Sequence, residues 1–145
     1  MASKNVETFR AAFQAFNRRD FDAVLRVIAE DAIFHDRARD VTFKGRNGFR
    51  EFMQGWVTAF SNAEVVEPKF IDAGDIVVAE FIGRGLNDGP LGPLPPTGKQ
   101  LSLHFCEIMW FNDGGQIVSG AEYYDQLSMM VQLGHALPAQ AAAAG

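Results

Sequence analysis

The chain has 145 residues, 48% of them hydrophobic, which suits a single domain spanning residues 1–145 and leaves no room for a second. Thirteen Lys and Arg against eighteen Asp and Glu give a formal net charge of -5, and the basic residues are scattered, which argues against nucleic acid as a partner. No uninterrupted apolar run reaches the roughly 18 residues of a membrane span and none resembles a signal segment, so we expect a soluble, cytoplasmic protein with no membrane partner.

The predicted elements begin with helices. Apolar residues recur at helical steps over residues 4–17, and a shorter run over residues 21–28 follows Asp20, a suitable N-cap. Residues 31–36 mix β-branched and aromatic side chains, which predicts a short strand running into an irregular charged segment. A third helix, which we expect Asn47 to cap, has an unusually aromatic inner face from residue 49 to residue 60.

The apolar period then changes to two, which predicts strands over residues 65–71, 76–86, 100–112 and 116–124. The turns DAGD and NDGGQ join them as antiparallel hairpins. The Pro-rich segment LNDGPLGPLPPTGK predicts an ordered loop that covers a cavity mouth. A last helix over residues 127–133 ends at Gly134, and we expect residues 136–145 to form a flexible tail. The order predicts an α+β domain.

Titratable residues interrupt the strand over residues 101–111. Alternation places His104, Cys106 and Trp110 on one face and Glu107 on the other. In the following strand Glu122 and Tyr124 share a face. Alternation alone leaves open which faces of the two strands coincide. Single Cys106 excludes an internal disulfide, and the widely spaced histidines give no metal motif.

The chain resembles a known superfamily. The order of elements, the segment AEDAIFHD, the PPTGK before the long strand and the ending GGQIVSGAEYYDQL resemble the nuclear transport factor two-like superfamily, and within it the SnoaL-like polyketide cyclases, from about residue 6 to residue 134. The resemblance implies a cone-shaped, curved antiparallel sheet wrapped around three N-terminal helices, with a deep apolar pocket. In such cyclases the acid that opens the EYYD-like ending faces the pocket and acts as acid or base. Glu122 occupies that position here, in place of the usual Asp.

The same resemblance implies the rest of the site. Its register turns His104 and Cys106 toward the pocket with Glu122, and Phe34 and Asp36 on the first strand. We predict Glu122, His104 and Asp36 as catalytic groups. The non-catalytic alternatives are a position at the rim of the pocket for Glu122 and a surface ion pair of Asp36 with Arg37 or Arg39. Glu107 is expected at a dimer interface or in solvent. The residues expected to bind substrate are mostly aromatic: Phe13, Phe34, His35, Trp56, Phe81, Cys106, Trp110 and Tyr124.

The expected function is that of a cofactor-independent enzyme of the polyketide or ester cyclase type, which performs acid–base chemistry, such as intramolecular aldol closure, on an apolar carbonyl compound. Alternatives are a non-catalytic protein that binds a small hydrophobic or aromatic molecule, or a cofactor-free isomerase or hydroxylase. Epoxide hydrolysis is disfavoured because the related hydrolases have an Arg and an Asp where this chain has Phe81 and Gly83. The resemblance also implies a homodimer through an outer face formed by Leu103, Phe105, Met109, Phe111 and Tyr123.

Overall fold

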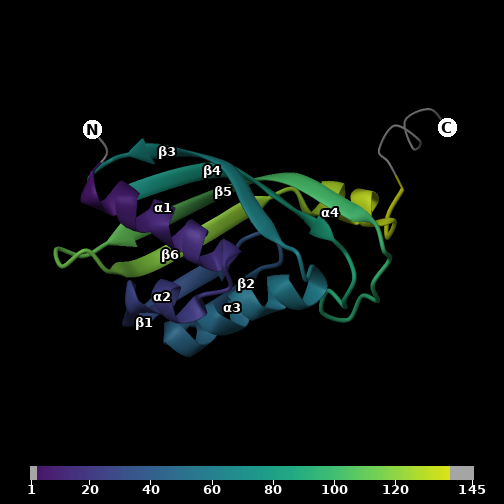
Figure 1. Ribbon diagram of the computed structural model, residues 1–145, viewed down its shortest axis with the longest axis horizontal. Coiled ribbons are helices and arrows are strands. Elements are labelled where there is room, and N and C mark those ends of the chain that lie inside the picture. The colour runs from purple at the N-terminus through teal and green to yellow at the C-terminus, as the bar shows by residue number, and fades with distance from the viewer. Residues whose placement is uncertain (1–2, 138–145) are drawn as a thin grey trace.

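The protein is described here by a computed structural model that covers residues 3–137. Within them a six-stranded sheet has the order β2-β1-β6-β5-β4-β3 (Figure 1). The helices are α1 (Lys4–Asn17), α2 (Phe21–Arg26), α3 (Gly45–Ala59) and α4 (Gln126–Leu133). The strands are β1 (Ile28–Asp36), β2 (Val41–Lys44), β3 (Glu64–Asp72), β4 (Ile76–Leu86), β5 (Gln100–Phe111) and β6 (Ile117–Tyr124).

Side-chain caps mark the N-termini of three of the four helices within the described residues. Ser3 and Asp20 accept hydrogen bonds from the backbone of the first turns of α1 and α2, and Asp125 does the same for α4. Gly134 ends α4 in the left-handed conformation, with φ 85°. The capping role predicted for Asp20 and the stop predicted at Gly134 are therefore confirmed.

The start of α3 differs from the prediction. Asn47 does not cap the helix, which follows Lys44 without any side-chain cap. Gly45, with φ 70°, lets the chain turn from β2 directly into α3, so the helix begins before Asn47. The segment expected to be irregular also contains β2, because Phe43 packs edge-to-face on Phe52 of α3, with ring centroids 5.4 Å apart.

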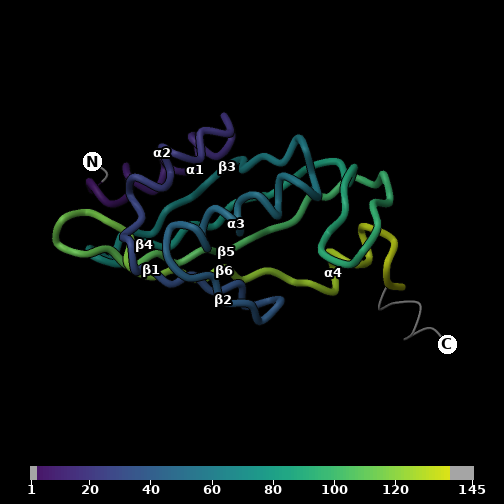
Figure 2. The backbone as a smooth tube through the Cα atoms, turned by 90° about the horizontal axis from the view of Figure 1, so that it is seen from below, coloured from purple at the N-terminus to yellow at the C-terminus, as the bar shows by residue number. Residues whose placement is uncertain are grey.

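The sheet is curved around the helices, as expected, and all its neighbouring strands are antiparallel except β1 and β6, which run parallel. Helices α1, α2 and α3 lie on one side of it, and α4 lies at one end, packed against β5 (Figures 1 and 2). Buried aromatic side chains fill the space between: Phe9, Phe13, Phe34, Phe49, Phe52 and Phe81. The fold therefore places an aromatic core against the inner face of β4, β5 and β6.

The Pro-rich loop between β4 and β5 is ordered around one buried side chain. Asn87 is fully buried and donates to the carbonyl oxygens of Ala59 and Gly89, both at 3.0 Å. Its own oxygen accepts from the backbone N–H and the hydroxyl of Thr97. None of residues 87–99 lines the cavity described below, so the prediction that this loop covers a cavity mouth is wrong. The loop is tied instead to the end of α3.

Two expectations concern the chain as a whole. No helix within residues 3–137 combines the length and the apolar character that crossing a membrane requires. Most of the tail predicted over residues 136–145 lies outside the described residues.

Candidate active site

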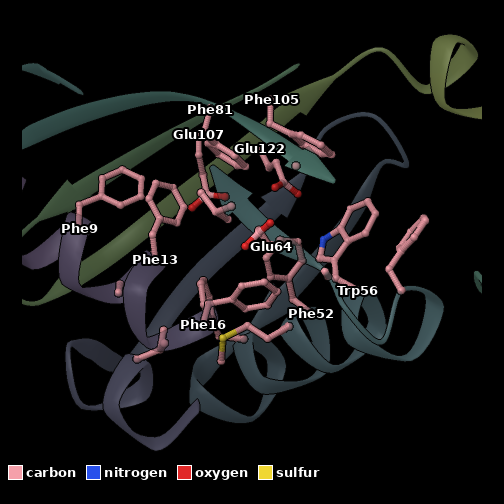
Figure 3. Close-up of a pocket in the computed structure, with 18 of the residues that line it drawn as sticks. Phe9, Phe13, Phe16, Phe52, Trp56, Glu64, Phe81, Phe105, Glu107 and Glu122 are labelled. Atoms are coloured by element: carbon pink, nitrogen blue, oxygen red, sulfur yellow. The ribbon is translucent and has the colours of Figure 1, made fainter. Parts of the chain in front are cut away.

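A cavity of about 90 Å³ lies between the helices and the inner face of the sheet (Figure 3). Its walls are almost entirely apolar and include Phe13, Phe16, Phe52, Trp56, Phe81 and Phe105. A cavity of about 150 Å³ is large enough for benzene. The space therefore suits a single small ring after minor side-chain shifts, and a polycyclic compound would require the walls to move.

Two carboxyl groups face each other in this cavity. Glu107 of β5 and Glu122 of β6 are directly opposite in the antiparallel register, and both line the cavity. Their exposed fractions are 5% and 3%. The side chains are in hydrogen-bonding contact with each other. Two buried carboxylates this close repel strongly, so the pair is stable when it holds a proton.

The surroundings raise the pKa values of both groups. Burial raises the pKa of Glu107 to about 7, although its hydrogen bond with Glu122 acts in the opposite direction. Burial also raises the pKa of Glu122 well above its ordinary value, assisted by the charges of Glu107 and Asp36 and opposed by Arg39. Both shifts favour a pair that holds a proton near neutral pH. The pair offers an acid and a base in the same place.

Asp36 lies beside this pair but has its own partners. It is paired with Glu122 in the parallel register of β1 and β6, and it is fully buried. Its carboxylate accepts from the backbone N–H and the Nε of Arg39, at 3.0 and 2.7 Å, and from the hydroxyl of Tyr124 at 3.0 Å. The pairing of Asp36 with Arg39 considered from the sequence is present, with Asp36 fully buried and the Arg39 side chain 30% exposed. These contacts make Asp36 a positioning residue for Tyr124 and Arg39.

Tyr124 keeps its proton in this arrangement. Burial, followed by the charge of Asp36, raises the pKa of Tyr124. Its hydroxyl donates to Asp36, and its ring contacts Phe105 at 4.9 Å and Trp56 at 5.7 Å between centroids. The hydroxyl proton is therefore held in the hydrogen bond to Asp36, and the ring packs behind the wall of the cavity.

Two polar atoms in the cavity wall lack a partner. Nε1 of Trp56 and Oε2 of Glu122 are buried, and neither makes a hydrogen bond within the described residues. At the cavity edge Glu64 of β3 and Arg84 of β4 also line the space, but they bind each other at 2.7 Å and remain half-exposed. Among the described residues, Trp56 Nε1 and Glu122 Oε2 are therefore the atoms of the cavity interior that can form a hydrogen bond with a ligand.

The orientation predicted for His104, Cys106 and Trp110 is wrong. A β-bulge at Val118 interrupts the hairpin: Phe111 pairs with Ile117, whereas Trp110 pairs with Ser119. An unbroken register would have set Cys106 opposite Glu122, and the extra residue brings Glu107 there instead. A shift of one residue in the register of β5 against β6 exchanges the inward and outward faces of β5. His104 is exposed on the outer face, and Trp110 is 36% exposed there.

The same reversal corrects the expected dimer face. Leu103, Phe105, Met109 and Phe111 are all buried on the inner side, and of the predicted outer residues Tyr123 alone is exposed, at 44%.

On β1, His35 lies on the face opposite Asp36 and its Nδ1 contacts the hydroxyl of Thr42 at 3.1 Å.

Several residues that were predicted to bind substrate do lie in or next to the cavity wall. Phe13, Trp56 and Phe81 line the cavity together with Glu122. Phe34 lies beneath the wall, against Phe49 and Phe52, with centroid distances of 5.1 and 4.5 Å. The sequence reasoning missed Glu107 as a site residue. An acid inside the otherwise apolar row of Leu101, Leu103, Phe105 and Met109 was the available signal.

Within residues 3–137, His, Cys, Asp and Glu side chains form no cluster of three or more arranged to hold a metal ion. The polar groups of the cavity that the structure does bring together are carboxyl groups and an indole N–H. These are proton donors and acceptors.

Comparisons with known proteins give a consistent picture. No curated protein gave a match. A proposed SnoaL-like polyketide cyclase from Jannaschia sp. CCS1 has 24% identity and a TM-score of 0.82, with 95% of this chain and 99% of that chain covered. A proposed polyketide cyclase from Xanthomonas campestris pv. campestris has 26% identity and a TM-score of 0.79, with 89% and 96% covered. AclR, a proposed hydroxylase from Streptomyces galilaeus, has 20% identity and a TM-score of 0.80, with 97% and 88% covered.

A protein family described as SnoaL-like polyketide cyclase matches residues 6–133. The solved structures share the fold of this chain, including a protein from Catenulispora acidiphila that is described as having a ketosteroid isomerase-like fold. Since the family match spans most of the chain, the protein belongs to the SnoaL-like polyketide cyclase family.

Proposed function

We propose that the protein is an acid–base enzyme of the cyclase type, which removes a proton next to a carbonyl group in an apolar compound and closes a ring by an aldol step. The observation that carries this proposal is the buried Glu107–Glu122 pair in an apolar cavity. Glu107, and not the predicted His104, is the catalytic partner of Glu122 in this proposal. Family membership supports a cyclase-type reaction.

The Glu107–Glu122 pair can accept and donate the protons that an aldol closure requires. The carboxylate member takes a proton from the carbon next to one carbonyl group, and the electron pair left behind forms the new C–C bond to the second carbonyl carbon. The oxygen of that second carbonyl receives the bond electrons and takes the proton of the carboxylic acid member. One proton enters the pair and one leaves it, so the pair again holds a single proton and no other reactant is needed.

The electrostatic setting favours this chemistry. A general base works best when its pKa lies near the operating pH, and the pKa of Glu107, about 7, meets that condition. Glu122, with its more strongly raised pKa, suits the acid. The apolar walls also strengthen any hydrogen bond to the developing oxyanion.

The test uses a single-ring ketone, which the cavity admits after minor side-chain shifts. Cyclohexanone in D₂O exchanges the protons next to its carbonyl group when a base removes them, and proton NMR follows the loss of signal. We expect the protein to accelerate this exchange, and Glu107→Gln, which removes the base, to lower the rate by about 100-fold or more. His104→Ala, on the outer face, is the matched control and should leave the rate unchanged. An unchanged rate in Glu107→Gln would refute the mechanism.

One observation favours a second candidate, a non-catalytic protein that binds a small hydrophobic molecule. The cavity walls are almost entirely apolar, and such a ligand needs no carboxyl pair. Glu122→Ala distinguishes the two functions, because it removes the acid while leaving the apolar walls. Affinity for an apolar ligand that survives this change, together with no proton exchange in the wild type, would support the binding protein. A cofactor-free isomerase shares the enolisation step and differs in its product.

A further inference from the structure

The indole of Trp56 has an unused hydrogen-bond donor. Its Nε1 is buried and has no partner in the described part of the chain. Buried indole N–H groups ordinarily find an acceptor, because leaving one unpaired costs free energy. An unpaired donor in the wall of a cavity is explained when the missing acceptor belongs to a ligand.

The indole ring is held firmly near the carboxyl pair. It packs edge-on against Phe105, with centroids 5.8 Å apart, and against Tyr124 at 5.7 Å. These two residues are opposite each other in the sheet, and each is two residues from Glu107 or Glu122 on its own strand. Side chains two apart on a strand share a face. Trp56 therefore lies across the cavity at the level of the pair.

The direction of the N–H agrees with this placement. Figure 3 shows the nitrogen of Trp56 turned toward the cavity, on the side where the Glu122 carboxyl group lies. The guanidinium group of Arg39 lies over the indole ring, 5.4 Å from its centroid, and so fixes the ring from another side. The N–H is thus preorganised to meet a group placed between Trp56 and Glu122.

The charge around this space selects a neutral group. Two acidic side chains line the interior, and the cations nearby are already paired: Arg39 with Asp36, and Arg84 with Glu64. An anionic ligand would meet carboxyl groups without a free cation. A carbonyl oxygen is neutral, accepts from an indole N–H, and accepts a second hydrogen bond from a protonated carboxyl group.

We propose that Trp56 Nε1–H donates a hydrogen bond to a carbonyl oxygen of a neutral carbonyl compound no larger than a single ring, and so holds the carbon next to that carbonyl beside the Glu107–Glu122 pair. This inference rests on the proposed function and narrows its substrate class. The ring size follows from the cavity of about 90 Å³. The indole N–H is then the group that stabilises negative charge on that oxygen when the neighbouring proton leaves.

The wild-type protein allows a direct test. It has 2 Trp residues, so its ¹H–¹⁵N spectrum has two indole signals, and Trp110→Phe assigns them. The probes are cyclohexanone and methylenecyclohexane, in which a CH₂ group replaces the oxygen. We expect cyclohexanone to move the Trp56 indole proton downfield and methylenecyclohexane to cause no such shift. The Trp110 signal on the outer face should stay in place with both.

Two results would overturn the proposal: equal shifts of the Trp56 signal with both probes, or no binding of cyclohexanone. Trp56→Phe, which keeps an aromatic ring, should slow the exchange of the cyclohexanone protons by about 100-fold. Exchange in the wild type without a ketone-specific shift would refute the role of Trp56 and leave the acid–base pair standing. A ketone-specific shift without exchange would refute the acid–base function and leave a carbonyl-binding site.

Discussion

Replacing Glu107 by Gln should remove a large part of the pH dependence of folding stability. Gln has nearly the same size and cannot ionise. The pKa of Glu107 rises from 4.5 to about 7 on folding. The unfolded chain therefore releases this proton at a lower pH than the folded protein does. The free energy of unfolding is then highest below pH 4.5 and falls as the pH rises through the folded pKa near 7.

The magnitude follows from that shift. A rise of roughly 2.5 pH units, at about 1.4 kcal/mol per unit, corresponds to about 3 kcal/mol of stability lost between pH 4.5 and slightly above pH 7. Urea unfolding at 25 °C, measured across this range, gives the free energy at each pH. We expect the wild-type curve to fall relative to the Glu107→Gln curve by about 3 kcal/mol over this interval.

The difference between the two proteins is the informative quantity, because the titrating groups outside the pair contribute to both curves. Glu122 acts in the same direction as Glu107, since Glu107→Gln also removes the charge that helps to raise the pKa of Glu122. Parallel curves for the wild type and Glu107→Gln would show that Glu107 ionises normally in the folded protein, and the argument for a proton-sharing pair would fail.

Four further changes have definite expected outcomes. Gly83→Ala would place a Cβ 2.7 Å from the Phe105 ring and push it into the cavity, so cyclohexanone binding measured by NMR should weaken at least about tenfold. Asn87→Ala removes a buried side chain that ties the Pro-rich loop to α3, and urea unfolding should show a loss of about 2–4 kcal/mol. His104→Ala should leave thermal stability within a few degrees of the wild type, because the side chain is exposed. The expected homodimer stays a prediction: light scattering at micromolar concentration should give about twice 16.0 kDa, and Tyr123→Glu on the outer face should reduce it toward the monomer.

Much of the fold follows from local patterns in the sequence. The first helix was predicted with its observed bounds, and the strand over residues 76–86 likewise, because their apolar periods are uninterrupted. The start of α3 and the presence of β2 were missed. Both depend on features that periodicity does not contain, namely the positive φ of Gly45 and the packing of Phe43 on Phe52.

The inward-facing residues were predicted correctly on β1 and β6 but incorrectly on β5, and the β-bulge in β6 is the reason. The inward direction of Glu122 and Asp36 followed from the resemblance, and the two residues are indeed side by side. The bulge at Val118 adds one residue to β6, and neither Val118 nor its neighbours Ile117 and Ser119 is a Gly or Pro that would mark that position. A period of two gives each strand its two faces, but only the register across the hairpin decides which faces coincide.

Glu107 departs from a pattern that the rest of its strand follows. An acid in the buried row of β5 costs desolvation energy, and a protein that needed only a core would have another apolar side chain there. The cost is reduced because the raised pKa values of Glu107 and of Glu122, which lies opposite, favour a pair that holds a proton. A second departure, the unpaired indole N–H of Trp56, faces the same cavity. Local rules of folding are broken most often where function requires it, and here both exceptions line one cavity, which admits a small ring after minor side-chain shifts.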